Sequence, residues 1–275
     1  MRHSINFKGR LITLDSPLIM GVINVSPDSF YAESRKTDID SILNKAEQML
    51  NEGADIIDIG AMSSRPGAEI LSESEELKRI IPAVSAMSKR FPESIISVDT
   101  LRSNVAQEVI NSGAVCINDI SAGTFDINMM KVAADNNVPY IMMHMKGLPS
   151  DMQIDPKYDD VVTEILIYFS DRIRRARDTG IKDIIIDPGF GFGKTIEHNY
   201  EIMRRLEVFK IFDIPILVGV SRKSMIWKVL GLNADQALNG TTALNMYSLS
   251  KGAGILRVHD VKEAKECVAL FKRLL

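Results

Sequence analysis

The sequence contains little cysteine, no long hydrophobic run and no excess of positive charge. Its two cysteines, Cys116 and Cys267, have neither a disulfide nor a metal-binding spacing, which favours a reducing compartment. Nowhere do 18 apolar residues follow one another, so we predict no membrane-spanning helix. Residues 1–4 lack the apolar core of a signal peptide. We therefore expect a cytoplasmic protein with no membrane partner.

The charged residues are nearly balanced, with 33 lysines and arginines against 36 aspartates and glutamates. This balance gives no electrostatic footprint for nucleic acid. Apolar residues make up 45% and charged residues 25% of the 275-residue chain, which is typical of a globular protein. No low-complexity or linker-like stretch divides the sequence, so we predict a single domain over 1–275.

Short apolar runs recur along the whole chain. They are continuous rather than alternating, as expected for strands that are buried on both faces of a parallel sheet. The eight runs lie at 18–23, 55–60, 95–98, 114–117, 138–143, 183–186, 214–218 and 254–258. A further stretch at about 5–14, around Lys8-Gly9-Arg10, predicts an N-terminal β-hairpin beneath the sheet.

Helical spacing of apolar residues fills the intervals between these runs. Ser72 and Glu75 form a capping-box pattern before one helix, and Gly53 and Gly180 follow two others as stop signals. The expected helices cover 39–50, 73–84, 103–112, 127–136, 162–176, 197–210 and 261–271, with more than one helix in 223–250. This alternation favours a (β/α)8 TIM barrel, and a doubly wound open sheet is the alternative.

Polar residues follow almost every predicted strand. In a barrel, the carboxyl ends of the strands converge on one mouth, where the chemistry takes place. Taken singly, Asp58 and Asp119 fit a turn or a helix cap best, and His144 is as compatible with a packed histidine as with a site residue. The residues at the strand ends are Asn24, Asp58, Asp99, Asn118, Asp119, His144, Asp187, Ser221, Arg257 and His259.

These residues, with Arg65 and Lys223 from the adjoining loops, fall into two chemical classes. Carboxylates and amides that accept parallel hydrogen bonds suit a flat heterocycle such as an amino-pyrimidinone, and this class holds Asp99, Asn118 and Asp187. Donors suit a phosphate or diphosphate, and this class holds Arg65, Lys223, Arg257 and His259.

The glycine-rich segment 187–195 ends in Gly193-Lys194-Thr195, like a phosphate-binding P-loop. The spacing fails, because only three residues separate Gly189 from Gly193 where that motif has four. We favour a loop whose glycines allow close approach to a planar ligand flanked by Phe192. A tight strand-to-helix turn with buried phenylalanines is the structural alternative.

Several blocks of the sequence resemble the dihydropteroate synthase family. Met20-Gly21-Val22-Ile23-Asn24-Val25-Ser26-Pro27-Asp28-Ser29-Phe30 is similar to its first signature, and Asp58-Ile59-Gly60 with 63–68 is similar to its second. The resemblance continues in the same order through 97–100, 118–121, 143–147, 186–195, 221–226 and 257–260. Each block is weak alone, but eight in order are very specific.

The resemblance implies a TIM-barrel transferase of folate biosynthesis, a sulfonamide target and a homodimer. Its reaction joins 6-hydroxymethyl-7,8-dihydropterin diphosphate and 4-aminobenzoate to give 7,8-dihydropteroate. The catalytic residues it implies are Asp99, Arg65, Lys223, Arg257 and His259. The residues implied for pterin and diphosphate are Asn24, Ser64, Asp99, Asn118, Met142, Asp187, Phe192, Lys223, Arg257 and His259. Those implied for 4-aminobenzoate are Phe30, Ser64, Arg65, Pro66 and Ser221. The cofactor implied is Mg²⁺, near Asn24.

Two other functions share this pattern. A pterin-dependent methyltransferase has the same barrel and acceptor pocket but no diphosphate to hold, and Arg65 with Pro66-Gly67 argues against it. The other is a non-catalytic pterin-binding homologue, and the intact set of Asn24, Arg65, Lys223 and His259 argues against it. The chain departs from the usual family pattern at Met62, where a glutamate is common, and this position lies close to the expected substrates.

Overall fold

The computed structural model describes residues 3–25, 35–61, 71–147 and 152–275. Its centre is a sheet of eight parallel strands that neighbour one another in the order β8-β7-β6-β5-β4-β3-β10-β9. The strands are β3 (Leu18–Asn24), β4 (Ile56–Gly60), β5 (Ile95–Asp99), β6 (Cys116–Asp119), β7 (Tyr140–Met143), β8 (Ile184–Asp187), β9 (Leu217–Val218) and β10 (Ile255–Val258).

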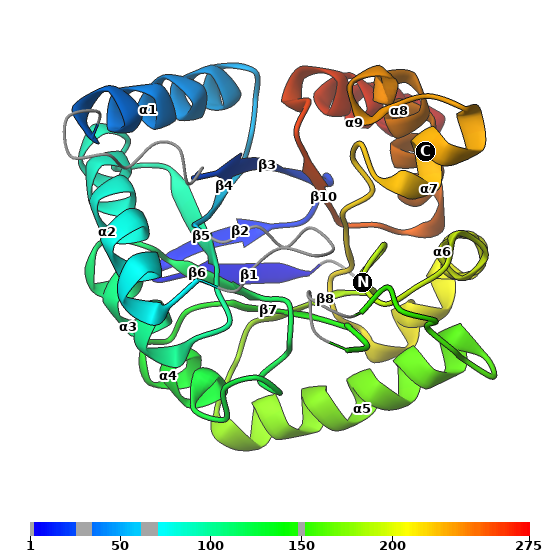
Figure 1. The fold of residues 1–275 in the computed structure, drawn as a ribbon, viewed down its shortest axis with the longest axis horizontal. Helices are drawn as coiled ribbons and strands as arrows, with labels where there is room; N and C mark the ends of the chain where they lie inside the picture. Colours follow the sequence, from blue (N-terminus) through cyan, green and yellow to red (C-terminus); the bar gives the residue numbers. More distant parts are fainter. Residues whose placement is uncertain (1–2, 26–34, 62–70, 148–151) are drawn as a thin grey trace.

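The two ends of this sheet meet. A parallel bridge between Ile186 and Ile216 links β8 to the residues just before β9, which closes the ring almost completely. Figure 1 shows the helices surrounding the strands. An open doubly wound sheet would leave two separate edge strands, so the predicted (β/α)8 barrel is confirmed.

The helices lie in the intervals that the sequence predicts. The α-helices are α1 (Arg35–Asn51), α2 (Glu73–Arg90), α3 (Ser103–Asn111), α4 (Met129–Asp135), α5 (Val161–Thr179), α6 (Ile196–Arg204), α7 (Ser224–Leu230), α8 (Leu238–Lys251) and α9 (Val261–Leu274). The helix predicted over 197–210 is instead α6 followed by a 3₁₀ helix, η2 (Leu206–Phe212). A second 3₁₀ helix, η3 (Ala234–Gln236), separates α7 from α8. Within the described residues, none of the helices combines the length and hydropathy needed to cross a bilayer.

The predicted helix ends are formed by the expected residues, with one difference: the Glu75 side chain bonds Arg79 instead of completing the capping box with Ser72. Ser72 caps α2 by accepting a hydrogen bond from the Glu75 backbone N–H at 3.3 Å. The Glu75 side chain accepts from Nε of Arg79 at 2.9 Å, so its charge stabilises the following turn of the helix. Gly180 ends α5 with φ of 102°, a conformation that glycine adopts without steric cost.

The hairpin seals the amino-terminal end of the barrel. Its strands β1 (Ser4–Phe7) and β2 (Arg10–Thr13) pair antiparallel and cross the middle of the ring in Figure 1. Ile5 and Phe7 are buried against an apolar layer that fills the barrel interior at this end. The layer consists of Leu18, Met20, Ile56, Ile95, Cys116, Ile141, Ile185, Leu217 and Ile255. The predicted hairpin is therefore present, and it covers the barrel interior at this end.

Phe7→Ala should destabilise the barrel by about 3–5 kcal/mol, because a phenylalanine that is only 2% exposed leaves a cavity when truncated. Urea unfolding followed by circular dichroism measures the loss. Leu11→Ala is the matched control in the same hairpin: Leu11 is 67% exposed, and its loss should stay within about 0.5 kcal/mol. Equal losses in the two variants would contradict the sealing role of the hairpin.

Candidate active site

A row of polar positions crosses the carboxyl ends of four neighbouring strands. The strand register pairs Asn24 with Gly60, Gly60 with Asp99, and Asp99 with Asn118. A Cβ atom at Gly60 would lie 3.3 Å from Cβ of Asp99, so the missing side chain leaves room for the carboxylate. Asn24, Asp99 and Asn118 are therefore brought to one level of the barrel mouth, as the sequence predicts.

Asp58 lies two residues before Gly60 in β4, one layer deeper in the barrel than this row, and is completely buried. Its carboxylate accepts hydrogen bonds from Ser97 Oγ at 2.7 Å and from Asn118 Nδ2 at 3.0 Å. Arg257 donates to it from Nε at 2.8 Å and forms an ion pair through Nη2 at 2.7 Å. The interpretation of Asp58 as a turn or capping residue was wrong. It lies inside β4, and the two-residue period of a strand points it into the barrel with Gly60.

Asp99 shares the guanidinium of Arg257. Its Oδ2 atom lies 3.3 Å from Nη2 of Arg257. Burial raises the pKa of Asp99 to about 7 although Arg257 opposes the rise, and the nearby Asp58 charge adds to it. Two carboxylates thus depend on one guanidinium, and Asp99 gains most from any N–H donor that a ligand brings.

Asp187 and Lys223 meet across the loop that follows β8. Asp187 accepts from the Gly189 backbone N–H at 2.8 Å, and burial raises its pKa. Lys223 donates to the Phe190 carbonyl and lies 4.8 Å from the centroid of the Phe192 ring. Burial lowers the pKa of Lys223 to about 8, while Asp187 counteracts that shift. The structure therefore brings Asp187, Phe192 and Lys223 together.

Met142 does not lie on this wall. It is fully buried in the apolar core between the sheet and the helices, with residues such as Ile117 and Ile165. Its neighbour Met143 packs instead with Phe192 in a smaller cluster at the mouth. The prediction of Met142 is corrected to Met143, because successive residues of β7 point to opposite faces of the sheet.

Ser221 and His259 are in direct contact. Nδ1 of His259 lies 3.0 Å from Oγ of Ser221, and the His259 backbone N–H donates to the same oxygen at 3.2 Å. Burial, helped by Arg257, lowers the pKa of His259 to about 4, so the imidazole is neutral near pH 7. A bidentate ion pair of Arg222 with Asp260, at 2.7 and 2.9 Å, joins the two loops that carry Ser221 and His259.

The remaining site predictions fall on the loops after β3 and β4. Asn24 is exposed at the end of β3. Phe30, Ser64, Arg65 and Pro66 lie outside the described residues, as does Met62. Among the residues that the structure describes, no group of three histidine, cysteine or acidic side chains could hold a metal ion. The Asn24 amide oxygen suits Mg²⁺ as a single ligand, provided that phosphate oxygens and water complete the shell.

Two other strand-end residues have structural roles. Asp119 accepts from the Ser121 and Gly123 backbone N–H groups at 2.8 and 2.7 Å and from Tyr140 at 2.6 Å, which confirms the turn predicted for it. His144 is buried beside Lys194. Because Lys194 is only 3% exposed, it cannot serve a P-loop, in agreement with the failed spacing of that motif.

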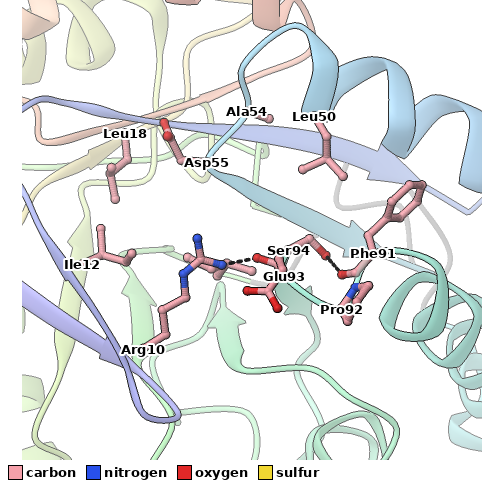
Figure 2. Close-up of a pocket in the computed structure, with 11 residues that line it drawn as sticks. Arg10, Ile12, Leu18, Leu50, Ala54, Asp55, Phe91, Pro92, Glu93 and Ser94 are labelled. Atoms are coloured by element: carbon pink, nitrogen blue, oxygen red, sulfur yellow. Dashed lines mark hydrogen bonds between the residues drawn. The ribbon is translucent and has the colours of Figure 1, made fainter.

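A cavity of about 410 Å³ lies at the other end of the barrel, beside the hairpin. Figure 2 shows Arg10 reaching toward Glu93, whose carbonyl it contacts. Asp55 in the same lining accepts from the Ile19 backbone N–H at 2.8 Å and pairs with Lys265 at 3.6 Å. The polar side chains Arg10 and Asp55 of this cavity are thus engaged in contacts that hold the hairpin and strand β3. The mouth therefore remains the candidate active site.

Asp58→Asn should destabilise the protein by about 3 kcal/mol, because it leaves the guanidinium of Arg257 without its closest counter-charge. The free energy of urea unfolding measures the effect. Ser97→Ala is the control, since it removes one neutral donor to the same carboxylate and should cost about 1 kcal/mol. A loss in Asp58→Asn no larger than that of the control would show that the ion pair does not organise the mouth.

Comparison with known proteins identifies the family of this chain. A family model described as "Pterin binding enzyme" matches residues 20–259. Dihydropteroate synthase of Escherichia coli K12 is 42% identical over 98% of this chain and 95% of its own length. The Haemophilus influenzae enzyme of the same name is 41% identical over 96% of each chain.

Solved structures agree with the fold. The Yersinia pestis dihydropteroate synthase in a sulfonamide drug complex has a TM-score of 0.91 and 39% identity, covering 100% of this chain and 98% of its own. The Xanthomonas albilineans enzyme with 4-aminobenzoic acid has the same TM-score, 34% identity and the same coverage. The chain therefore belongs to the dihydropteroate synthase family of pterin-binding transferases, which condense 6-hydroxymethyl-7,8-dihydropterin diphosphate with 4-aminobenzoate in folate biosynthesis.

Proposed function

We propose that the pterin ring of the diphosphate substrate binds inside the barrel mouth, against Asp99, Asn118 and Asp187. The observation that supports this most directly is that Asn118 and Asp187 are buried, and Asp99 nearly so, above an apolar floor. Buried carboxylates with raised pKa values need donors, and an aminopyrimidinone ring carries several N–H groups on one edge. Phe192 and Met143 supply the apolar wall for the flat ring.

The diphosphate lies toward Arg257, His259 and Lys223 in this proposal. The contacts of Arg257 described above engage its Nε and Nη2 atoms, which leaves Nη1 for an anion. His259 contributes a neutral hydrogen-bond donor near pH 7, because its pKa is about 4 in the absence of an anion. Arg65, which lies outside the described residues, is proposed as a further cation for the same group.

Mg²⁺ is proposed as the cofactor, with Asn24 as its ligand from the described residues. When bound, the ion would neutralise negative charge on the leaving diphosphate. The residues of the chain then orient the two substrates and stabilise charge. Departure of diphosphate leaves positive charge that the dihydropterin ring spreads, and Asp99 and Asp187 lie where they stabilise that charge. The arylamine nitrogen attacks the methylene carbon and then loses a proton, without a strong base on the enzyme.

The second substrate and the inhibitors enter beside the diphosphate. The Xanthomonas albilineans relative holds 4-aminobenzoic acid and the Yersinia pestis relative a sulfonamide. We propose the same two ligand classes here, bordered by Ser221 and by Phe30, Ser64, Arg65 and Pro66. Formation of dihydropteroate from both substrates by the purified protein tests the function, since a methyltransferase or a non-catalytic homologue would form none.

A homodimer in the cytoplasm completes the proposal. The surface beside α7 and α8 exposes large apolar side chains, among them Val229 (57%), Leu230 (52%), Leu232 (38%) and Tyr247 (40%). A cluster of this kind supports a protein–protein interface. The two buried, free cysteines are compatible with a reducing compartment.

Asp187→Asn should weaken pterin binding about 100-fold or more. The amide would present its own N–H₂ to a ligand N–H, and a site built around a polar edge discriminates strongly against such a mismatch. Isothermal calorimetry with unreactive 6-hydroxymethyl-pterin measures the affinity. Unchanged affinity would remove Asp187 from the pterin pocket.

The pH dependence of kcat/KM for the pterin diphosphate should be bell-shaped. Asp99 must be ionised to accept hydrogen bonds, so its pKa of about 7 sets the acid limb, and Lys223 must be protonated, so its pKa of about 8 sets the alkaline limb. We expect a maximum between about pH 7 and 8 and a loss of about sevenfold at about pH 6 and pH 9.

Two variants separate the limbs. Lys223→Arg should abolish the alkaline limb, because a guanidinium stays charged throughout this range. Asp99→Asn should abolish the acid limb along with much of the activity. Persistence of the alkaline limb in Lys223→Arg would assign it to another group.

A further inference from the structure

Lys194 is a buried lysine whose contacts are all neutral acceptors. Its side chain is 3% exposed, and its Nζ atom lies 3.0 Å from Nδ1 of His144. Three backbone carbonyls complete the surroundings: His144 O at 3.2 Å, Gly189 O at 2.9 Å and Phe192 O at 3.0 Å. This set of neutral acceptors resembles the coordination shell of a monovalent cation.

The ammonium form fits these neighbours best. An ammonium brings three N–H donors, one for each of the three carbonyl oxygens, whereas a neutral amine has only two N–H groups to offer them. Burial lowers the pKa of Lys194 well below its usual value, while the charge of Asp187 and the three carbonyl acceptors favour the ammonium. His144 is buried as well, and its pKa is lowered, so it stays neutral and can accept at Nδ1.

The loop that Lys194 holds is packed unusually closely on the chain after β7. Gly189, Gly191 and Gly193 have φ values of 74°, 85° and 64°. A Cβ atom at Gly189 would lie 2.0 Å from the His144 carbonyl oxygen, and one at Gly193 would lie 2.2 Å from that of Lys146. This close approach gathers the carbonyl oxygens of His144, Gly189 and Phe192 within 3.2 Å of one Nζ atom, and oxygens gathered in this way repel one another unless hydrogen-bond donors or a positive charge lie between them.

The same loop carries three groups of the pterin pocket. The Gly189 backbone N–H fixes the Asp187 carboxylate at 2.8 Å. The Phe190 carbonyl accepts from Lys223, and the Phe192 ring faces that ammonium. Lys194 is bonded to the carbonyls of Gly189 and Phe192, so it holds both ends of the segment that bears these contacts.

We propose that Lys194 is a positioning residue of the pterin pocket, an internal cation that shapes the 189–193 loop without touching substrate. It takes the place that a bound monovalent ion would occupy among carbonyl oxygens. This role rests on the proposed pterin site and explains why a lysine ends the glycine-rich segment although that segment lacks P-loop spacing. Loss of the charge should misplace Asp187, Phe192 and Lys223 together.

The first test is Lys194→Met, which keeps the length of the side chain and removes the charge. Pterin affinity by calorimetry should fall about 100-fold, the loss expected when binding groups shift by about 1 Å. The KM for 4-aminobenzoate should change less than about twofold, a split that general destabilisation would not produce. The control is Lys146→Met in the neighbouring segment. Its half-exposed side chain pairs with Glu164, and its loss should leave pterin affinity unchanged.

The second test uses chemical rescue and remains informative if Lys194→Met folds poorly. Lys194→Ala leaves a space for propylammonium, which carries the missing three carbons and the ammonium. Propylammonium chloride at about 50 mM should restore pterin affinity by about tenfold or more, while sodium chloride at the same ionic strength should restore none. The absence of rescue in a folded Lys194→Ala protein, or unchanged affinity in Lys194→Met, would overturn the proposal. Failure of the wild-type protein to bind pterin would instead overturn the proposed function.

Discussion

The ion pair between Asp58 and Arg257 is the interaction on which the rest of the barrel mouth depends. It joins β4 to β10 across 199 residues of sequence and orients two other groups. Asn118 is held because its amide donates to the Asp58 carboxylate, and Arg257 extends from Asp58 to Asp99. A buried ion pair contributes little net stability compared with apolar packing. Its value here is geometric, because the one carboxylate of Asp58 fixes the position of both the Asn118 amide and the Arg257 guanidinium.

The barrel interior is divided into two layers with opposite requirements. The lower layer is apolar and is sealed by Ile5 and Phe7 of the hairpin, so it excludes water from below. The upper layer holds three buried or nearly buried carboxylates, Asp58, Asp99 and Asp187, that need positive partners. Arg257 and Lys223 supply them. The dry floor strengthens every charge interaction above it, because the local dielectric constant is low.

The sequence predicts the barrel and most of its mouth because both depend on local patterns. Continuous apolar runs and helical spacing repeat eight times, and the residues that end the runs must share one rim. The errors at Asp58 and Met142 have one cause. Each depends on which face of a strand a residue occupies, and a continuous apolar run does not show that phase. Gly60 pairs with Asp99 at the mouth, and Asp58 lies two residues before Gly60 on the same strand. The two-residue period of a strand therefore places Asp58 on the inner face as well.

Other features of the site arise from contacts that sequence spacing cannot give. The partner of Arg257 lies in a strand near the other end of the chain, and Lys194 turns back into its own loop because three glycines let the carbonyls converge. These contacts also explain the perturbed acidities. Asp99 and Asp187 have raised pKa values because folding buries them with too few donors, a cost accepted in the free protein. In the proposed pterin site, a ligand edge that carries N–H groups would remove that cost on binding, so the unpaired carboxylates of the free barrel would contribute to the affinity.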